Sequence, residues 1–209
     1  VPVVLRRFGE TTTVLATTLR HLGERPAAPP PVPNLPESLA LLVNGRGGMA
    51  RIHMAPGVVT SKYDALLAAN LHPSAPCDRH VLAKRVRLWV IADGFLTTLG
   101  SENLLSFEPG PPAVWRFAAN AGDERRVAIR MVAFMREGEN ATVLRFEREA
   151  ESPDLGTVLG PSGAVSLTVR IDLEDRGFHA ETHRNEGSEH HFASNVHHRT
   201  GERGFFFSP

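Results

Sequence analysis

Two groups of ionisable residues near the end of the chain have a spacing that chemistry could use. His179, Glu181 and His183 would share one face of a strand, because strand side chains alternate between its two faces. Such a face resembles a zinc site, but zinc ligands usually converge from several segments and no cysteine supports this set. We favour the alternative, a polar, solvent-facing strand followed by a loop. We therefore predict no metal site and no cofactor.

Asp172 and Glu174 form the second group, on the polar face of a strongly alternating segment. Glycoside hydrolysis needs two carboxyl groups, and positions two apart on a strand separate their Cβ atoms by about 6–7 Å. Any exposed strand face produces this spacing. Arg170 and Arg176 flank the pair and are expected to keep both groups ionised, whereas a general acid needs a raised pKa. We predict no catalytic residue here.

The stretch Leu41–Lys84 combines glycines with polar residues in an uncommon way. Residues 41–48 read LLVNGRGG, residues 60–67 read TSKYDALL and residues 79–84 read RHVLAK. No Gly-Lys-Ser/Thr follows the glycines, so this is not a phosphate-binding loop. In order and spacing the stretch resembles the N-terminal domain of glycogen debranching enzymes, the amylo-α-1,6-glucosidase family, which reads LLTNGxGG, TRRYHGLL and RxxLxK. Asp64 and Ala65 depart from the His-Gly of that pattern.

The resemblance implies a non-catalytic β-sandwich domain of a glycoside hydrolase that acts on α-1,6 branches of α-glucan. In such enzymes the catalytic carboxylates lie in a helical (α/α)-barrel after the sandwich, so the chain is expected to lack its own catalytic centre. The expected partners are a branched α-glucan or malto-oligosaccharide and that C-terminal catalytic domain. The chain starts at Val1 and ends on an apolar run, so we expect a fragment cut before the barrel.

Five residues of the matching stretch are predicted to bind substrate, because their side chains could converge on sugar hydroxyls: Asn44, Arg46, Lys62, Tyr63 and Asp64. The glycine-rich loop could instead pack against the barrel. A free-standing carbohydrate-binding or interaction module is the alternative function. Sugars also stack on aromatic rings, and the candidates are Tyr63, Trp89, Trp115, Phe178 and Phe192. For both tryptophans we favour a position in the core or between sheets.

The overall composition argues against two classes of partner. The formal net charge is zero and the pI is about 7.3, which opposes a broad nucleic-acid or membrane surface. No apolar run is long enough to span a membrane, and no signal peptide is visible. Cys77 is the single cysteine, so no intrachain disulfide forms, which fits a reducing compartment. We expect an inert Cys77 and a cytoplasmic protein.

Period-two alternation dominates the sequence after residue 36. Val165–Leu173 shows it most clearly, and His80–Asp93 forms another long strand pattern. Val127–Met135 and Ala141–Arg148 flank a short Glu-Gly-Glu-Asn turn and predict a hairpin. Shorter strands are expected at 113–118, 178–183 and 203–207. Many strands without alternating helices predict an all-β fold, a large antiparallel β-sandwich of the supersandwich type, with a β-barrel as the alternative.

The first 36 residues are predicted to form a separate unit. Leu15, Leu19 and Leu22 have helical spacing, so Glu10–Gly23 is expected to form a short helix, although its β-branched threonines also favour a strand. Six prolines within Arg25–Pro36 predict an extended arm. The predicted domains are therefore residues 1–36, the helix and arm, and residues 37–209, the sandwich.

Overall fold

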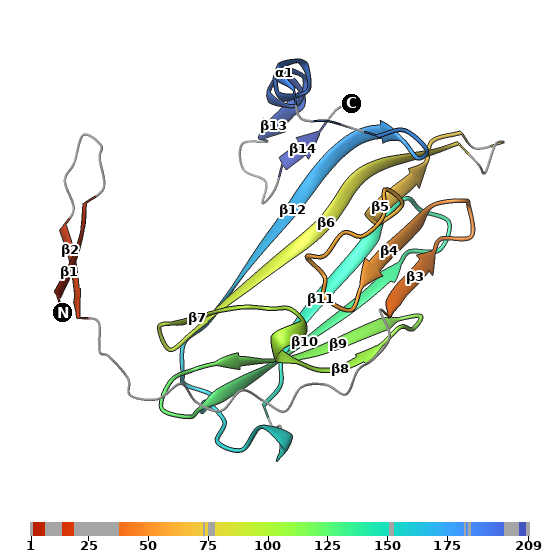
Figure 1. The fold of residues 1–209 in the computed structure, drawn as a ribbon. Helices are drawn as coiled ribbons and strands as arrows, with labels where there is room; N and C mark the ends of the chain where they lie inside the picture. The colour runs from red at the N-terminus through yellow and green to blue at the C-terminus, as the bar shows by residue number, and fades with distance from the viewer. Residues whose placement is uncertain are drawn as a thin grey trace.

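The computed structural model describes the backbone of residues 2–6, 14–18, 38–198 and 205–207, with gaps at 73, 75–77, 151, 152, 182 and 184. Side chains are described only between residues 38 and 195. Cys77 and the proline-rich arm lie outside the described residues. Two antiparallel sheets dominate the described chain (Figure 1), which confirms the all-β prediction.

The first sheet contains the longest strands. Its order is β12-β6-β5-β4-β3, and β7 pairs with the last four residues of β6, Trp89–Ala92, on the edge opposite β12 and beyond the residues that pair with β5. The two segments with strongly alternating sequences are neighbouring strands in this sheet, because β12 pairs with β6 over most of the length of both strands. The strands are β3 (Leu39–Val43), β4 (Met49–His53), β5 (Ala65–Asn70), β6 (Arg79–Ala92), β7 (Phe95–Thr98) and β12 (Val165–Gly177).

The second sheet has the order β11-β10-β9-β8 and includes the predicted hairpin. Its strands are β8 (Leu104–Glu108), β9 (Ala113–Asn120), β10 (Arg126–Met135) and β11 (Thr142–Arg148). Two short 3-10 turns flank it, η1 (Ser101–Asn103) and η2 (Pro153–Leu155). Two separate strand pairs complete the described backbone: β1 (Pro2–Arg6) with β2 (Val14–Thr18), and β13 (Val196–His198) with β14 (Phe205–Phe207).

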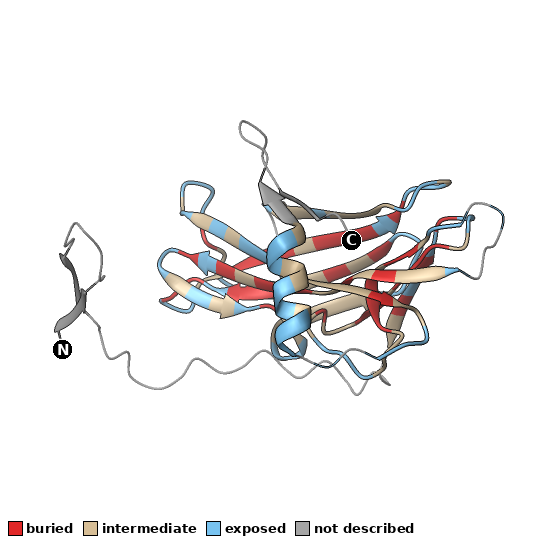
Figure 2. Cartoon of the chain, turned by 90° about the horizontal axis from the view of Figure 1, so that it is seen from above, coloured by how far each residue is buried: buried red, intermediate tan, exposed pale blue. Residues whose placement is uncertain are grey.

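The hydrophobic core lies between the two sheets. Alternate residues of β6, among them Val86 and Leu88, meet Trp115 and Phe117 of β9, and all four are buried. Figure 2 shows buried positions recurring along the strands between more exposed ones, as period-two burial requires. Trp115 is in the core as expected, whereas the core or between-sheet position favoured for Trp89 was wrong. Trp89 points to the opposite face from Leu88, with Arg85 and Arg87, and is partly exposed.

The two sheets leave an apolar groove between β12 and β11. A cavity of about 390 Å³ opens there. Val169 and Ile171 of β12 contribute to it, and each keeps about 40% of its surface exposed. The lining residues are Leu66, Leu67, Ala83, Thr142, Leu144, Phe146, Val169 and Ile171. This side of the sandwich is therefore less completely covered than its centre.

Two predictions of secondary structure were wrong. The segment expected as a helix contains strand β2, in which Leu15 pairs with Leu5 of β1. Its β-branched residues are less crowded in an extended strand than in a helix. Residues 178–183 are not a strand either, because β12 ends at Gly177 and a turn follows at Phe178 and His179.

A helix that was not predicted follows this turn. α1 (Glu186–Asn195) carries no buried residue, so it lacks the apolar stripe that identifies a surface helix from sequence. Asn185 precedes it, and its Oδ1 accepts a hydrogen bond from the backbone N–H of Ser188 at 2.9 Å, a helix-capping contact. None of the helices in the described part of the chain has the length and apolar character needed to cross a bilayer.

Candidate functional site

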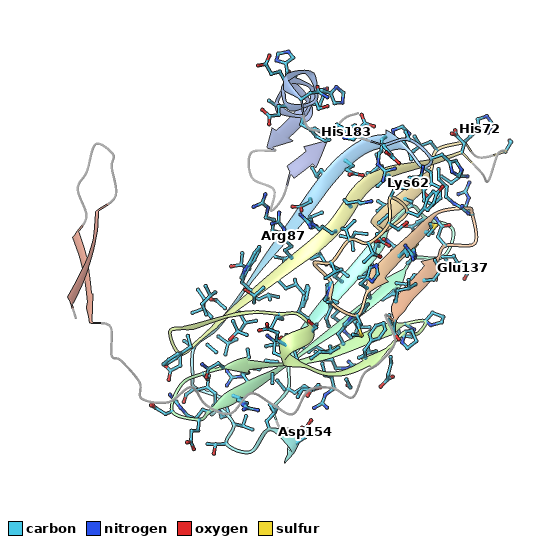
Figure 3. The ribbon with its side chains drawn as sticks, viewed as in Figure 1. Lys62, His72, Arg87, Glu137, Asp154 and His183 are labelled. Carbon is cyan, nitrogen blue, oxygen red and sulfur yellow. The ribbon has the colours of Figure 1, made fainter. Side chains whose placement is uncertain are left out.

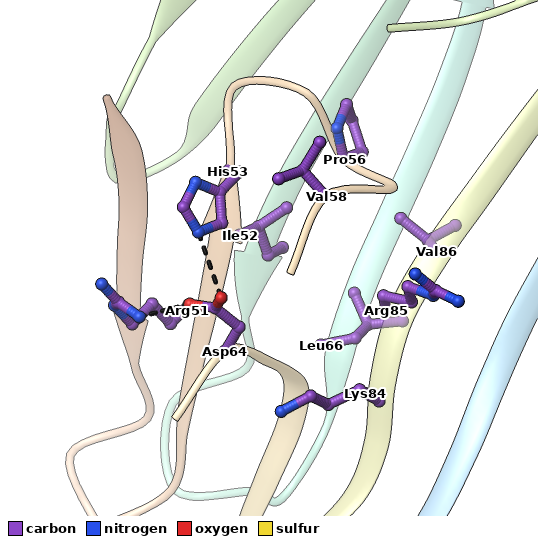
Figure 4. Close-up of a pocket in the computed structure, with 10 residues that line it drawn as sticks. All are labelled: Arg51, Ile52, His53, Pro56, Val58, Asp64, Leu66, Lys84, Arg85 and Val86. Atoms are coloured by element: carbon purple, nitrogen blue, oxygen red, sulfur yellow. Dashed lines mark hydrogen bonds and ion pairs between the residues drawn. The ribbon is translucent and has the colours of Figure 1, made fainter. Parts of the chain in front are cut away.

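The loop between β4 and β5, residues 54–64, is anchored by the carboxylate of Asp64. Its Oδ2 accepts hydrogen bonds from the backbone N–H groups of Thr60 at 2.6 Å and Ser61 at 2.8 Å. On the same carboxylate, Oδ2 contacts Nε2 of His53 at 3.1 Å, and Oδ1 pairs with Arg51 (Figure 4). Asp64 is only 1% exposed. The carboxylate therefore shapes the loop from inside.

The surroundings of Asp64 keep it ionised. Burial by itself would raise the pKa of this carboxyl group. The amide donors of Thr60 and Ser61, together with the charges of His53 and Arg51, outweigh burial and hold the pKa below its usual value. Asp64 is consequently an anion that fixes structure and is not a proton donor.

Lys62 and Tyr63 lie on the outer side of this loop and meet the turn that follows β12. The Tyr63 ring packs against Phe178 with ring centroids 4.9 Å apart and meets the His179 ring edge-on at 5.7 Å. Lys62 Nζ donates a hydrogen bond to the carbonyl of His179 at 3.1 Å and lies 5.5 Å from the Tyr63 ring centroid. The fold thus assembles an aromatic and basic patch from residues more than a hundred positions apart.

Arg176 connects the two segments beneath this patch. Its guanidinium donates hydrogen bonds to the carbonyls of Ala180 at 3.0 Å and, from the other loop, Lys62 at 2.5 Å. Its Nε also pairs with Glu174 at 2.7 Å. Arg176 is buried, so these bonds are protected from water. One side chain therefore sets the position of the β4–β5 loop against the turn after β12.

A polar cavity of about 350 Å³ opens beside the patch. Two of its lining residues, Lys62 and His183, are labelled in Figure 3. Lys84 reaches it from β6, and its Nζ donates to the carbonyls of Lys62 at 2.9 Å and Ser61 at 3.3 Å. Burial lowers the pKa of Lys84, and neighbouring carboxylates partly oppose that shift. The lining residues are Val59, Thr60, Ser61, Lys62, Lys84, Glu174, Arg176, Glu181 and His183. Both signs of charge and the two hydroxyl side chains of Thr60 and Ser61 line it, a set suited to a neutral ligand rich in hydroxyls.

The glycine-rich loop between β3 and β4 is organised by Asn44. Asn44 Oδ1 accepts hydrogen bonds from the backbone N–H groups of Arg46 and Gly48, both at 2.9 Å. Asn44 Nδ2 donates to the carbonyl of Glu139 at 2.8 Å and to Oδ1 of Asn140 at 3.1 Å, both in the β10–β11 turn. Asn44 is buried, and it joins a loop of the first sheet to a turn of the second.

Arg79 links the glycine-rich loop to the aromatic patch. Its Nε bonds the carbonyl of Gly47, and its guanidinium lies 5.5 Å from the Phe178 ring centroid. Arg46 remains at the surface, with Nη1 donating to the carbonyl of Gly138 at 3.1 Å. The two sequence motifs lie in loops that leave opposite ends of β4, and Arg79 and Phe178 connect them.

The comparison with family models agrees with the residues that build this region. The model described as glycogen debranching enzyme N terminal matches residues 40–208. The chain belongs to this family. No curated protein and no solved structure gave a significant match. The matched range covers both sheets and both loops, so the debranching-enzyme N-terminal domain extends well beyond the stretch in which the resemblance was first seen.

Within this debranching-enzyme domain the five predicted binding residues have different positions. Asn44 and Asp64 are buried and fully engaged with neighbouring backbone and side chains. Arg46, Lys62 and Tyr63 keep exposed surface from which they can contact a ligand. Glu174 and Arg176 also line the cavity but were not predicted as binding residues. Their position in the alternating strand pattern was the sequence feature that could have indicated them. Nothing in the sequence indicated that Arg176 would reach across to Lys62.

Asp172 of β12 is ionised in the folded domain. The carboxylate of Asp172 accepts hydrogen bonds from two arginines of β6, from Arg85 Nε at 2.6 Å and from Arg87 Nη2 at 2.7 Å. Although burial opposes it, these bonds lower the pKa of Asp172. Among the described residues, no cluster of three or more His, Cys, Asp or Glu side chains could hold a metal ion. His179, Glu181 and His183 follow the end of β12 and do not share a strand face.

Proposed function

We propose that this chain is the non-catalytic β-sandwich domain of a debranching-type glycoside hydrolase, and that the patch around Lys62 and Tyr63 contacts the α-glucan. The family assignment supports the first part. The junction of Tyr63, Phe178 and the polar cavity carries the second, because sugars stack their apolar faces on rings while polar groups take the hydroxyls.

The proposed division of labour places the chemistry elsewhere in the enzyme. Every described carboxyl group with a resolved pKa shift (Asp64, Asp154 and Asp172) has a lowered pKa, whereas a glycosidase needs one acid with a raised pKa. In our proposal a separate catalytic domain supplies the acid and base, and the sandwich holds part of the branched glucan. We also propose that the enzyme works in the cytoplasm, a reducing compartment that fits a chain with a single cysteine.

Tyr63→Ala is expected to weaken malto-oligosaccharide binding by about fivefold, since stacking of one ring contributes roughly 1 kcal/mol. Isothermal titration of the chain with maltohexaose, and with a branched oligosaccharide carrying an α-1,6 linkage, measures the loss. Phe134→Ala is the matched control, because Phe134 is a partly exposed ring on β10 in the second sheet. Equal affinity for the wild type and Tyr63→Ala, or no binding by the wild type, would contradict a glucan site at this patch.

A further inference from the structure

The outer edge of β12 is the longest strand edge without a strand partner in the described part of the chain, and helix α1 contacts its last part, where His191 Nε2 lies 3.0 Å from Asp175 Oδ2. β12 covers thirteen residues and pairs only with β6 among the described strands. Its second row of backbone N–H and C=O groups therefore has no strand neighbour there. A long free edge of this kind is a template for pairing with another chain.

The face of β12 that borders the groove is incompletely covered as well. Val169 and Ile171 lie on it and are each about 40% exposed. They line the apolar cavity between the two sheets together with Leu144 and Phe146 of β11. One further strand beside β12 would place apolar side chains over the mouth of this groove. An extended strand with alternating apolar residues would therefore both pair with the edge and cover the groove.

β12 itself has the required pattern, and it is complementary to its own antiparallel copy about Ile171. With Ile171 on a two-fold axis, Val169 of one copy faces Leu173 of the other, apolar against apolar. Arg170 faces Asp172 of the other copy, so opposite charges meet on the outer face. Arg170 is 63% exposed, and its Nε lies 3.3 Å from Asp172 of its own strand.

Asp172 has room for this additional partner. Arg85 uses Oδ2 and Arg87 uses Oδ1. Each carboxylate oxygen accepts two hydrogen bonds, so Oδ2 can still receive a guanidinium from across the new pair, whereas Oδ1 already lies near both Arg87 and Arg170 of its own chain. We propose that two copies of this chain associate through antiparallel pairing of β12 with β12, which joins their first sheets into one continuous sheet and covers both grooves.

Cross-linking tests the register of this pair directly. In a Cys77→Ser background, Ile171→Cys should form a disulfide-linked dimer under mild oxidation, because the two positions face each other across the axis. Val169→Cys is the matched control and should not link to itself. Val169→Cys mixed with Leu173→Cys should give the mixed dimer. Efficient self-linking of Val169→Cys, or none of Ile171→Cys, would overturn the register.

The oligomeric state tests the interface without any cysteine. Sedimentation analysis of the purified chain should show a concentration-dependent dimer. Arg170→Asp should weaken it by about tenfold, because it places like charges opposite each other twice per dimer. Circular dichroism of the variant confirms that the exposed substitution leaves the fold intact. A wild-type chain that stays monomeric, a dimer strengthened by Arg170→Asp, or an edge occupied by another domain of the enzyme would each overturn the proposal.

Discussion

Asp64→Asn is expected to lower the free energy of unfolding by about 3 kcal/mol, as removal of one partner from a buried ion pair does. Both backbone N–H groups, of Thr60 and Ser61, donate to Oδ2, so the amide oxygen of asparagine can replace that acceptor. Its NH2 group would then face the Arg51 guanidinium, which loses its counter-charge and its acceptor. Urea denaturation of the purified chain measures the difference. Asp123→Asn is the matched control, since Asp123 is exposed in a turn where asparagine is tolerated.

The pH dependence of this effect has a defined sign. The folded domain holds the pKa of Asp64 below the ordinary value of 3.8, so the unfolded chain binds the proton more readily. The stabilisation is therefore complete above the unfolded-state pKa and is lost as the pH falls through the lower folded-state pKa. The wild type and Asp64→Asn should differ most near neutral pH and converge in strong acid. A difference that grew on acidification would show that the carboxylate does not stabilise the loop.

Asn44→Ala is the second large expected loss, also about 3 kcal/mol, because several buried polar groups lose their partner together. The substitution leaves the backbone N–H groups of Arg46 and Gly48 and the carbonyl of Glu139 without the bonds that Asn44 makes. Thermal and urea unfolding report the change. Asn120→Ala is the control, since Asn120 is exposed and its side chain bonds only locally, to the N–H of Gly122.

Gly48 offers an independent check on the same cluster. A Cβ atom at Gly48 would lie 2.5 Å from Asn44 Nδ2 and 2.8 Å from Asn140 Oδ1, so Gly48→Ala should also destabilise the domain. Combined with Asn44→Ala it should cost less than the sum of the two single changes, because the first substitution removes the side chain with which the second collides. Strict additivity would mean that the two residues do not share this contact.

The sequence was sufficient for the parts of the fold that rest on alternation alone. The β12 and β6 patterns and the β10–β11 hairpin were found because one face of each strand is buried, and burial imposes a period of two. The helix predicted near the N-terminus was wrong because the helical spacing of the leucines was given more weight than the strand preference of the β-branched residues. Helix α1 was not predicted because none of its residues is buried, so the sequence there shows no helical periodicity of apolar residues. Its capping residue, Asn185, was the only local signal.

The candidate site was predictable in location but not in the role of each residue. The motifs led to the correct two loops, yet Asn44 and Asp64 turn inward while Lys62 and Tyr63 face outward. Polar residues in a glycine-rich loop satisfy backbone groups as readily as they bind ligands, and sequence does not separate these uses. The contribution of Phe178 and Arg176 depends on where β12 ends, which is decided by the turn at Gly177.

The side chain of Asn140 bonds the backbone of Asn70 like a missing strand neighbour, with Oδ1 3.1 Å from the Asn70 nitrogen and Nδ2 2.7 Å from its carbonyl oxygen. Thr142 adds a bond from Oγ1 to the carbonyl of Leu66 at 2.7 Å. The two sheets are thus fastened along β5, whereas their β12 side is open. In dilute solution, where the chain is monomeric and the outer edge of β12 is unpaired, spontaneous local opening should therefore begin at β12, and its amide protons should exchange with deuterated water long before those of β5 and β9.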